Sequence, residues 1–156
     1  VAFVQEYRRR HDSDVTLVLC GAEMMEIPDR DGVVVTGFVD DATRWSAIAG
    51  ADVLLQPSVQ ESFGMTIAEA WLMERPVLVQ HANVVTRGLV ERSGGGATYA
   101  GYSSFDAALD VLLSQPELRQ RAGAAGLRHV AAEYSWDAVM GRYEELLERV
   151  RASVEG

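Results

Sequence analysis

Along most of the chain, short apolar runs alternate with longer segments in which apolar residues recur at helical spacing. The apolar runs lie at residues 15–20, 33–36, 53–55 and 76–79, with a weaker one at 97–100. Runs of this kind are typical of strands buried on both faces of a parallel sheet. Helical spacing is found at residues 1–11, 41–49, 64–73, 105–112, 118–130 and 135–151. The alternation predicts an α/β fold, with a Rossmann-like, doubly wound parallel sheet flanked by helices.

Polar residues and glycines mark the ends of these elements. Asp40 or Asp41 is suited to cap the second predicted helix, and Ser135 the last one. Residues 21–32 predict a polar connection, and the three glycines of 94–96 a turn.

The two last predicted helices differ in character. The helix at 118–130 is expected to be interrupted at Gly123 and Gly126. The terminal helix at 135–151 carries an unbroken apolar face. That face consists of Trp136, Val139, Met140, Tyr143, Leu146, Leu147 and Val150.

Length and charge limit the classes of protein to consider. With 156 residues, of which 48% are hydrophobic, the chain is long enough for one well-packed domain, so residues 1–156 are expected to form a single unit. Lys and Arg number 14 against 23 Asp and Glu, which gives a formal net charge of −9. Because no basic cluster offsets this charge, nucleic acid is not an expected partner.

The single cysteine and the absence of long apolar segments suggest an intracellular protein. Cys20 ends an apolar run and has no second cysteine to pair with, so it is expected to be a small buried core residue. The sequence contains no signal-like start and no apolar span of membrane length. We therefore expect a soluble, cytoplasmic protein without a transmembrane segment, and a peripheral membrane location stays open.

Two glutamates, Glu61 and Glu69, flank a glycine where a predicted strand passes through a loop into a helix. A helix that begins near Gly64 presents unpaired N–H groups and a partial positive charge, which suit a phosphate, and glycine lacks the Cβ that would keep a ligand away. Ionised carboxylates accept hydrogen bonds from vicinal hydroxyl groups, so the pair is suited to a ribose and a sugar on either side of a diphosphate. The alternative is that both glutamates only favour the helix dipole, with no ligand.

The neighbouring residues carry a resemblance to a known family. Residues 57–79, PSVQESFGMTIAEAWLMERPVLV, resemble the donor-binding signature of family 4 glycosyltransferases: Pro-Ser precedes a glutamate, Phe-Gly follows it, and a second glutamate comes after seven intervening residues. Residues 16–21 and 35–39 are similar to two strands and turns of that family, and residues 116–119 and 134–136 to its helical tail.

The resemblance implies the C-terminal, nucleotide-sugar-binding half of a retaining glycosyltransferase of the GT-B fold. The reaction would be a metal-independent transfer of a hexosyl group from a UDP- or GDP-hexose to an acceptor hydroxyl, with no cofactor and no metal ligands. Glu61 would be the catalytic residue, in contact with the donor sugar, and Glu69 would hold the ribose. The other donor-binding residues would be Ser62, Phe63, Gly64, Met65 and Thr66 at the sugar and diphosphate, and Gly37, Phe38 and Val39 at the base.

The resemblance also implies partners. In the family an N-terminal domain binds the acceptor, which here is unknown (a glycan, a lipid or a small molecule), and a basic pair from a loop ahead of the segment matching Val1 binds the diphosphate. The terminal helix at 135–151 would pack on that N-terminal domain. The chain is therefore expected to be part of a longer polypeptide and to be inactive by itself.

Two departures from the family pattern stand out. Residues 80–88 lack the usual Gly-Gly turn, and Glu74 replaces a glycine that a helix end would favour. Arg87 is expected in the loop after a strand, either solvated or facing the diphosphate.

Other functions remain as alternatives. The same residues suit a non-catalytic nucleotide-sugar-binding or regulatory module that requires a partner chain, and a nucleotide-sugar epimerase or a phosphorylase can share the architecture. Hydrolases are disfavoured because the sequence has neither a Gly-x-Ser-x-Gly elbow nor a His-rich metal-ligand set.

Overall fold

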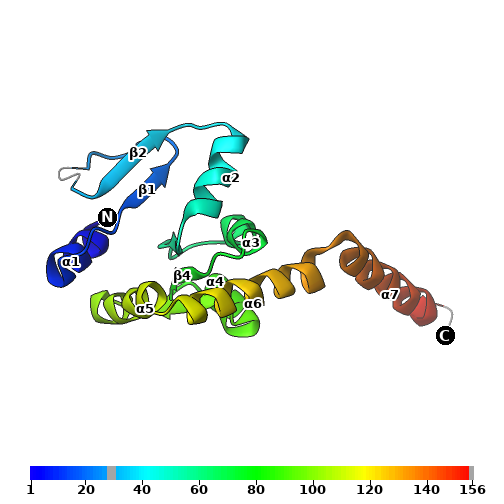
Figure 1. Ribbon diagram of the computed structural model, residues 1–156. Coiled ribbons are helices and arrows are strands. Elements are labelled where there is room, and N and C mark those ends of the chain that lie inside the picture. Colours follow the sequence, from blue (N-terminus) through cyan, green and yellow to red (C-terminus); the bar gives the residue numbers. More distant parts are fainter. Residues whose placement is uncertain (28–30, 155–156) are drawn as a thin grey trace.

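The computed structural model describes residues 1–27 and 31–154, in which helices alternate with short strands (Figure 1). The strands are β1 (Leu17–Cys20), β2 (Val33–Gly37), β3 (Leu54–Gln56), β4 (Val77–Gln80) and β5 (Gly96–Tyr99). The helices are α1 (Ala2–His11), α2 (Asp41–Gly50), α3 (Met65–Leu72), α4 (Val84–Ser93), α5 (Tyr102–Ser114), α6 (Pro116–Tyr134) and α7 (Trp136–Val154). Residues 28–30 of the predicted polar connection lie outside the described residues.

In the described segments the paired strands are parallel, and helices cover the three-stranded sheet, which confirms the predicted α/β class. The strands are divided over two sheets, of order β1-β2 and β3-β4-β5. In the described part of the chain, β1 and β3 therefore each have one edge without a partner strand. Val18 of β1 is 49% exposed although its apolar run predicts burial on both faces, because its side chain lies on an uncovered face of the two-stranded sheet. Val77 to Val79 of β4, which lie between two layers of helices, are 0% exposed.

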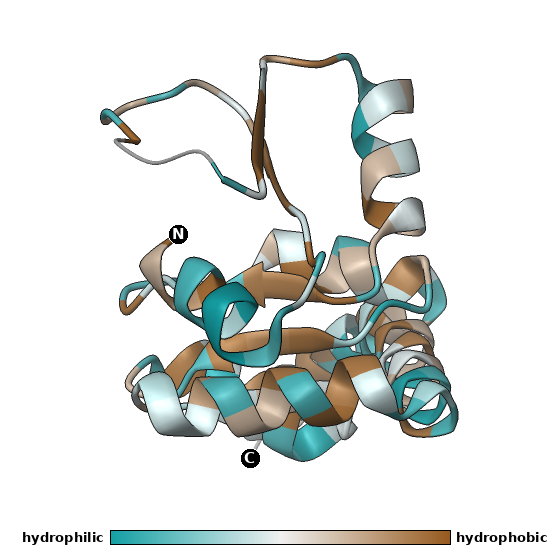
Figure 2. Ribbon diagram, turned by 60° about the vertical axis from the view of Figure 1, so that its left-hand side comes forward, coloured by the Kyte–Doolittle hydropathy of each residue, from teal (hydrophilic) through white to brown (hydrophobic). Residues whose placement is uncertain are grey.

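Helices pack on both faces of the three-stranded sheet, as expected for a doubly wound fold. Val77 and Val79 of β4 contact one cluster, formed with α3, α4 and α6. Leu78, which points to the opposite face, belongs to a second cluster formed with α1 and α5. Figure 2 shows apolar strands of this sheet between helices, whereas β1 and β2 extend away from them. The alternation along a single strand thus builds two cores.

Helix α6 is continuous, so the predicted interruption at its glycines is wrong. Both glycines are buried, and they allow close packing against α3. A Cβ atom at Gly123 would overlap the carbonyl oxygen of Glu74, and one at Gly126 would overlap the Trp71 ring. The small residues therefore let two helices approach each other rather than ending one of them.

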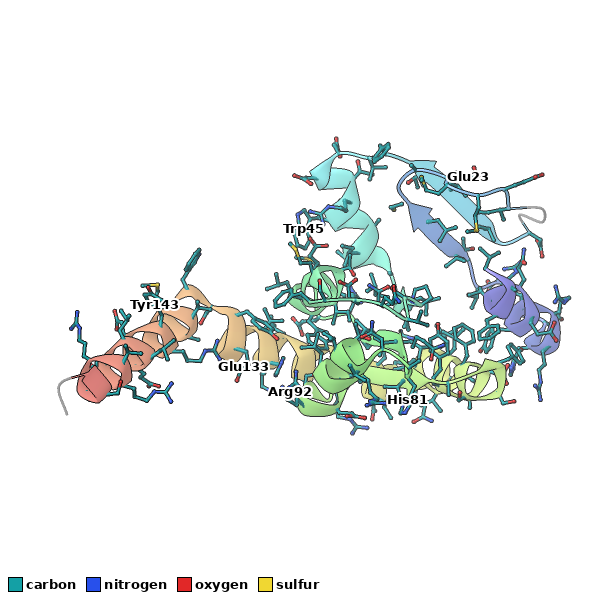
Figure 3. All side chains as sticks on the ribbon, turned by 180° about the vertical axis from the view of Figure 1, so that it is seen from behind. Glu23, Trp45, His81, Arg92, Glu133 and Tyr143 are labelled. Carbon is teal, nitrogen blue, oxygen red and sulfur yellow. The ribbon has the colours of Figure 1, made fainter. Side chains whose placement is uncertain are left out.

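Two apolar features of the sequence lie at the surface of the described chain. Cys20 is exposed, so its predicted burial is wrong, because β1 lacks cover on its outer edge and face. The apolar face of α7 is open in the described part of the chain: Tyr143 is 55% and Trp136 is 79% exposed. Figure 3 shows Tyr143 on α7 pointing away from the other elements. None of the helices in the described segments combines the length and apolar character that a membrane span requires.

Glu74, where a glycine would favour the helix end, adopts a left-handed backbone conformation with φ of 53°. A residue with a Cβ is strained in this region, whereas glycine is not. We expect Glu74→Gly to raise the free energy of unfolding by about 1 kcal/mol, measured by urea denaturation. Glu74→Ala, which removes the carboxylate but keeps the Cβ, is the control and should have little effect; an equal gain from both variants would contradict backbone strain as the cause.

Candidate functional site

The N-terminus of α3 provides free hydrogen-bond donors at the end of the Glu61–Gly64 loop. Gly64 caps the helix with φ of 79° and ψ of 49°, and no side chain caps it. The first N–H groups of a helix have no acceptor within the helix, so those of Met65 and Thr66 are available to an anion.

Gly64 is required at this position for a reason that the sequence did not indicate. It was expected to leave room for a ligand, but a Cβ atom at Gly64 would point into the core, 3.2 Å from Ile67 Cδ1 and 3.6 Å from Leu89 Cδ1. The left-handed backbone and the packed interior together favour glycine. Gly64 therefore determines the backbone conformation of the loop, and the space beside its Cα faces the core instead of a ligand.

Glu61 folds back on the loop that it begins. Its Oε1 accepts hydrogen bonds from the backbone N–H groups of Ser62 at 3.0 Å and Phe63 at 3.4 Å. Hydrogen bonds from the backbone of Phe63, Ser62 and Gly64 lower the pKa of the Glu61 carboxyl below its ordinary value. The carboxylate thus stays ionised and occupies donors that the sequence assigned to the sugar and diphosphate.

Glu69 lies one and a half turns into α3 and is held from a second helix. Arg44 Nη1 of α2 is 2.7 Å from Glu69 Oε1, and the two side chains are 35% and 18% exposed. The hydrogen bond to Glu69 raises the pKa of Arg44. The sequence does not single out Arg44, because it belongs to no motif and is 25 positions ahead of its partner. It indicates only that Arg44 lies in the predicted helix before the signature.

The remaining residues around the start of α3 are partly exposed. Phe63 is 48% exposed and lies edge-on against Tyr134 of α6, with ring centroids 5.4 Å apart. Met65 is 67% exposed. Thr66 accepts a hydrogen bond from Gln56 Nε2 at 3.4 Å. The resemblance at residues 134–136 marked Tyr134 only as part of a helical tail, because its contact with Phe63 depends on how α6 returns to the loop.

The residues predicted to meet the base lie apart from the α3 end. Gly37 ends β2 with φ of 70°, and Phe38, which follows it, is 88% exposed. Val39 is half-buried and leads into α2, which runs from this connection down to α3 (Figure 1). Glu61 thus lies just before α3 and Glu69 within it, and α2 connects this region to residues 37–39.

Arg87 and the surface depressions lie outside this arrangement. Arg87 was expected in a loop but belongs to α4, where it donates to the His81 carbonyl at 3.2 Å and lies 3.7 Å from Glu91. A polar depression lined by Glu74 and Arg121, among others, lies at the opposite end of α3 from Gly64. In the described segments, no group of three or more His, Cys, Asp and Glu side chains is placed to hold a metal ion.

Comparison with known proteins gives a consistent family. The sequence model described as "Glycosyl transferases group 1" matches residues 1–115. The chain is 35% identical over 119 residues to a phosphatidyl-myo-inositol mannosyltransferase of Mycobacterium leprae (strain TN), and 31% identical over 123 residues to an alpha-D-kanosaminyltransferase of Streptomyces kanamyceticus. Each alignment covers 75% of the chain and 32% of the relative, so the chain spans about a third of their length.

Solved structures share the fold at lower identity. TarM superposes with a TM-score of 0.74 and 16% identity, covering 93% of the chain and 31% of TarM. Sucrose-phosphate synthase from Thermosynechococcus elongatus superposes with a TM-score of 0.68 and 17% identity, covering 96% of the chain and 49% of that protein.

Proposed function

Since the chain belongs to the group 1 glycosyl transferases and has the fold of a GT-B C-terminal domain, we propose that it binds the nucleotide-sugar donor of a hexosyltransferase. The observation that carries this proposal is the start of α3, where Glu61 and Glu69 flank uncapped backbone donors. A diphosphate accepts hydrogen bonds from such donors, and the dipole of the helix favours its charge.

Each glutamate has a separate role in the proposal. Glu69, whose position within α3 is fixed by Arg44, accepts hydrogen bonds from the ribose hydroxyl groups with its remaining lone pairs. Glu61 accepts hydrogen bonds from hydroxyl groups of the donor sugar. Its present hydrogen bonds from the backbone N–H groups of Ser62 and Phe63 must break when the sugar and the diphosphate bind. Residues 37–39 contact the base, and their position depends on α2, which follows them in the chain and is attached to α3.

The proposed reaction is a retaining, metal-independent transfer of a hexosyl group. The bond between the anomeric carbon and the diphosphate oxygen breaks, the acceptor hydroxyl oxygen bonds to the anomeric carbon, and the hydroxyl proton is released. Preorganised backbone donors at α3 stabilise the negative charge that develops on the leaving diphosphate. None of the residues in the Glu61–Thr66 segment needs to act as a nucleophile in this scheme.

We propose that the rest of the enzyme supplies the acceptor site and further positive charge for the diphosphate. Three surfaces are suited to contact it: the apolar face of α7 and the unpaired edges of β1 and β3. A doubly wound sheet has the strand order 3-2-1-4-5-6. Here β2 and β1 match its strands 3 and 2, and the sheet β3-β4-β5 matches its strands 4, 5 and 6. Strand 1, which lies between these two groups, would come from outside the described chain. By itself the chain is expected to bind the donor without transferring the sugar.

Calorimetric titration tests the proposal, with UDP, GDP, ADP and their glucose or mannose conjugates added to the chain at low salt. We expect one nucleotide base to bind. Glu69→Gln should weaken both the nucleoside diphosphate and its sugar conjugate about tenfold or more, because a charge-assisted hydrogen bond is lost. Glu61→Ala should weaken the sugar conjugate preferentially.

Glu148→Gln, on the exposed polar face of α7, is the control for a change of charge and should bind like the unmodified chain. Failure of every nucleotide to bind would contradict the donor-binding function. Equal effects of the Glu61 and Glu69 changes on both ligands would contradict the roles assigned to them.

A further inference from the structure

We infer that Arg44 is a positioning residue of the nucleotide site, which aims the Glu69 carboxylate at the ribose and couples it to the loop at residues 37–39. This inference rests on the proposed donor-binding function. It concerns a residue outside the Glu61–Glu69 segment, on a helix that buries none of its own side chains.

The guanidinium group of Arg44 is held from three sides. Nη1 is 2.7 Å from Glu69 Oε1, and Nη2 is 3.3 Å from Asp41 Oδ1. The group also lies 4.9 Å from the centroid of the Trp45 ring, within the range of a cation–π contact. Figure 3 shows Trp45 on α2, on the part of the molecule that approaches α3. Planar Arg side chains that are fixed in this way lose little further freedom when a neighbour binds a ligand.

The ion pair leaves Glu69 with capacity for a ligand. A carboxylate offers about four acceptor positions, and Arg44 is bonded to one oxygen only. Oε2 therefore remains available to a hydroxyl group while Oε1 is tied. Because the rotamer of Glu69 is fixed before the ligand arrives, binding does not have to order that side chain, and preorganisation of this kind increases affinity.

The same contact connects the two parts of the proposed nucleoside site. Helix α2 begins at Asp41, directly after residues 37–39, and Asp40 caps it by accepting from the Thr43 N–H at 2.7 Å. Only Ile48 of α2 is found among the residues packed against the core, so the polar contact from Arg44 adds a second attachment to α3. Loss of the ion pair would free both the Glu69 carboxylate and the start of α2.

Charge gives Arg44 another effect. The chain has a formal net charge of −9, and the proposed ligand is an anion that would bind between Glu61 and Glu69. An arginine against Glu69 offsets part of the repulsion between that carboxylate and the diphosphate. Its removal should therefore weaken binding of the nucleoside diphosphate itself, and not only binding of the sugar.

The test compares Arg44→Met, Arg44→Lys and Glu69→Gln, titrated with whichever of UDP, GDP and ADP binds the unmodified chain. Arg44→Met should raise Kd about tenfold, and Arg44→Lys should restore part of the affinity, because an ammonium keeps the charge without the planar fork. In the double variant with Glu69→Gln, the Arg44→Met change should add little, since the two residues act on one contact.

Arg142→Met is the matched control, because it breaks an arginine–glutamate contact of 2.5 Å to Glu133, where α6 meets α7. It should leave Kd unchanged. An Arg44→Met chain that is folded by circular dichroism and binds as tightly as the parent, or more tightly, would overturn the inference, as would full additivity with Glu69→Gln. Failure of the unmodified chain to bind any nucleotide would instead overturn the proposed function, so the two failures are distinct.

Discussion

Replacement of Trp71 by alanine is expected to lower the free energy of unfolding by about 4 kcal/mol, the largest effect on stability among the changes considered. Trp71 of α3 is 0% exposed, and its indole Nε1 donates to the Gly95 carbonyl at 2.8 Å. A Cβ at Gly95 or at Gly126 would overlap the ring, so the side chain fills the space between the strand connection and α6. Alanine would leave a cavity and would remove one of the two hydrogen bonds to that carbonyl, which also accepts from the Val77 N–H at 3.1 Å.

Urea unfolding followed by circular dichroism measures this loss. Trp71→Phe keeps most of the ring but not the N–H donor, and should cost less than the alanine change. Trp136→Ala is the matched control, because Trp136 of α7 is 79% exposed and its removal should change stability by less than about 0.5 kcal/mol. If Trp71→Ala and Trp136→Ala had similar effects, the core around α3 would not be organised as described.

Local signals in the sequence predicted the elements around the site closely. The expected strand at 76–79 corresponds to Val77–Gln80, and the expected helix at 64–73 to Met65–Leu72. Here the apolar pattern, the proline and the glycine act over a few residues, and each favours the same element. The resemblance pointed to a glycosyltransferase for the same reason, since its most specific motif spans only residues 57–79.

Features that depend on contacts between distant segments could not be predicted. Burial of β1 depends on which segments cover the faces of its sheet, so Cys20 was wrongly expected in the core. The glycines of α6 resembled helix breaks because their packing partner, α3, is remote in sequence. The contact between Arg44 and Glu69 joins two helices whose relative placement no local pattern contains.

The structure also gives Gly64 a physical role that the sequence did not predict. Gly64 was singled out for an open approach to the ligand, but its missing Cβ faces Ile67 and Leu89 in the interior. The residue at the centre of the proposed ligand-binding surface is therefore part of the core packing. Stability and binding are expected to be coupled at this position, whereas at Glu61, which lies on the loop surface, they are expected to be largely separate.

Gly64→Ala is accordingly expected to reduce nucleotide affinity more than tenfold while lowering the free energy of unfolding by about 1–2 kcal/mol, because alanine is strained at φ of 79° and its methyl group would press on Ile67. A shift of the loop would move the backbone donors of α3 away from the diphosphate, and donors displaced by about 1 Å lose most of their effect.

Gly94→Ala is the matched control: Gly94 has φ of 67°, its nearest contact would be 4.0 Å away on Ala125, and it ends α4 instead of starting α3. Both variants should lose similar stability through backbone strain, measured by urea unfolding, but only Gly64→Ala should lose affinity in calorimetry. Unchanged nucleotide binding by a folded Gly64→Ala chain would mean that the ligand does not bind at the start of α3.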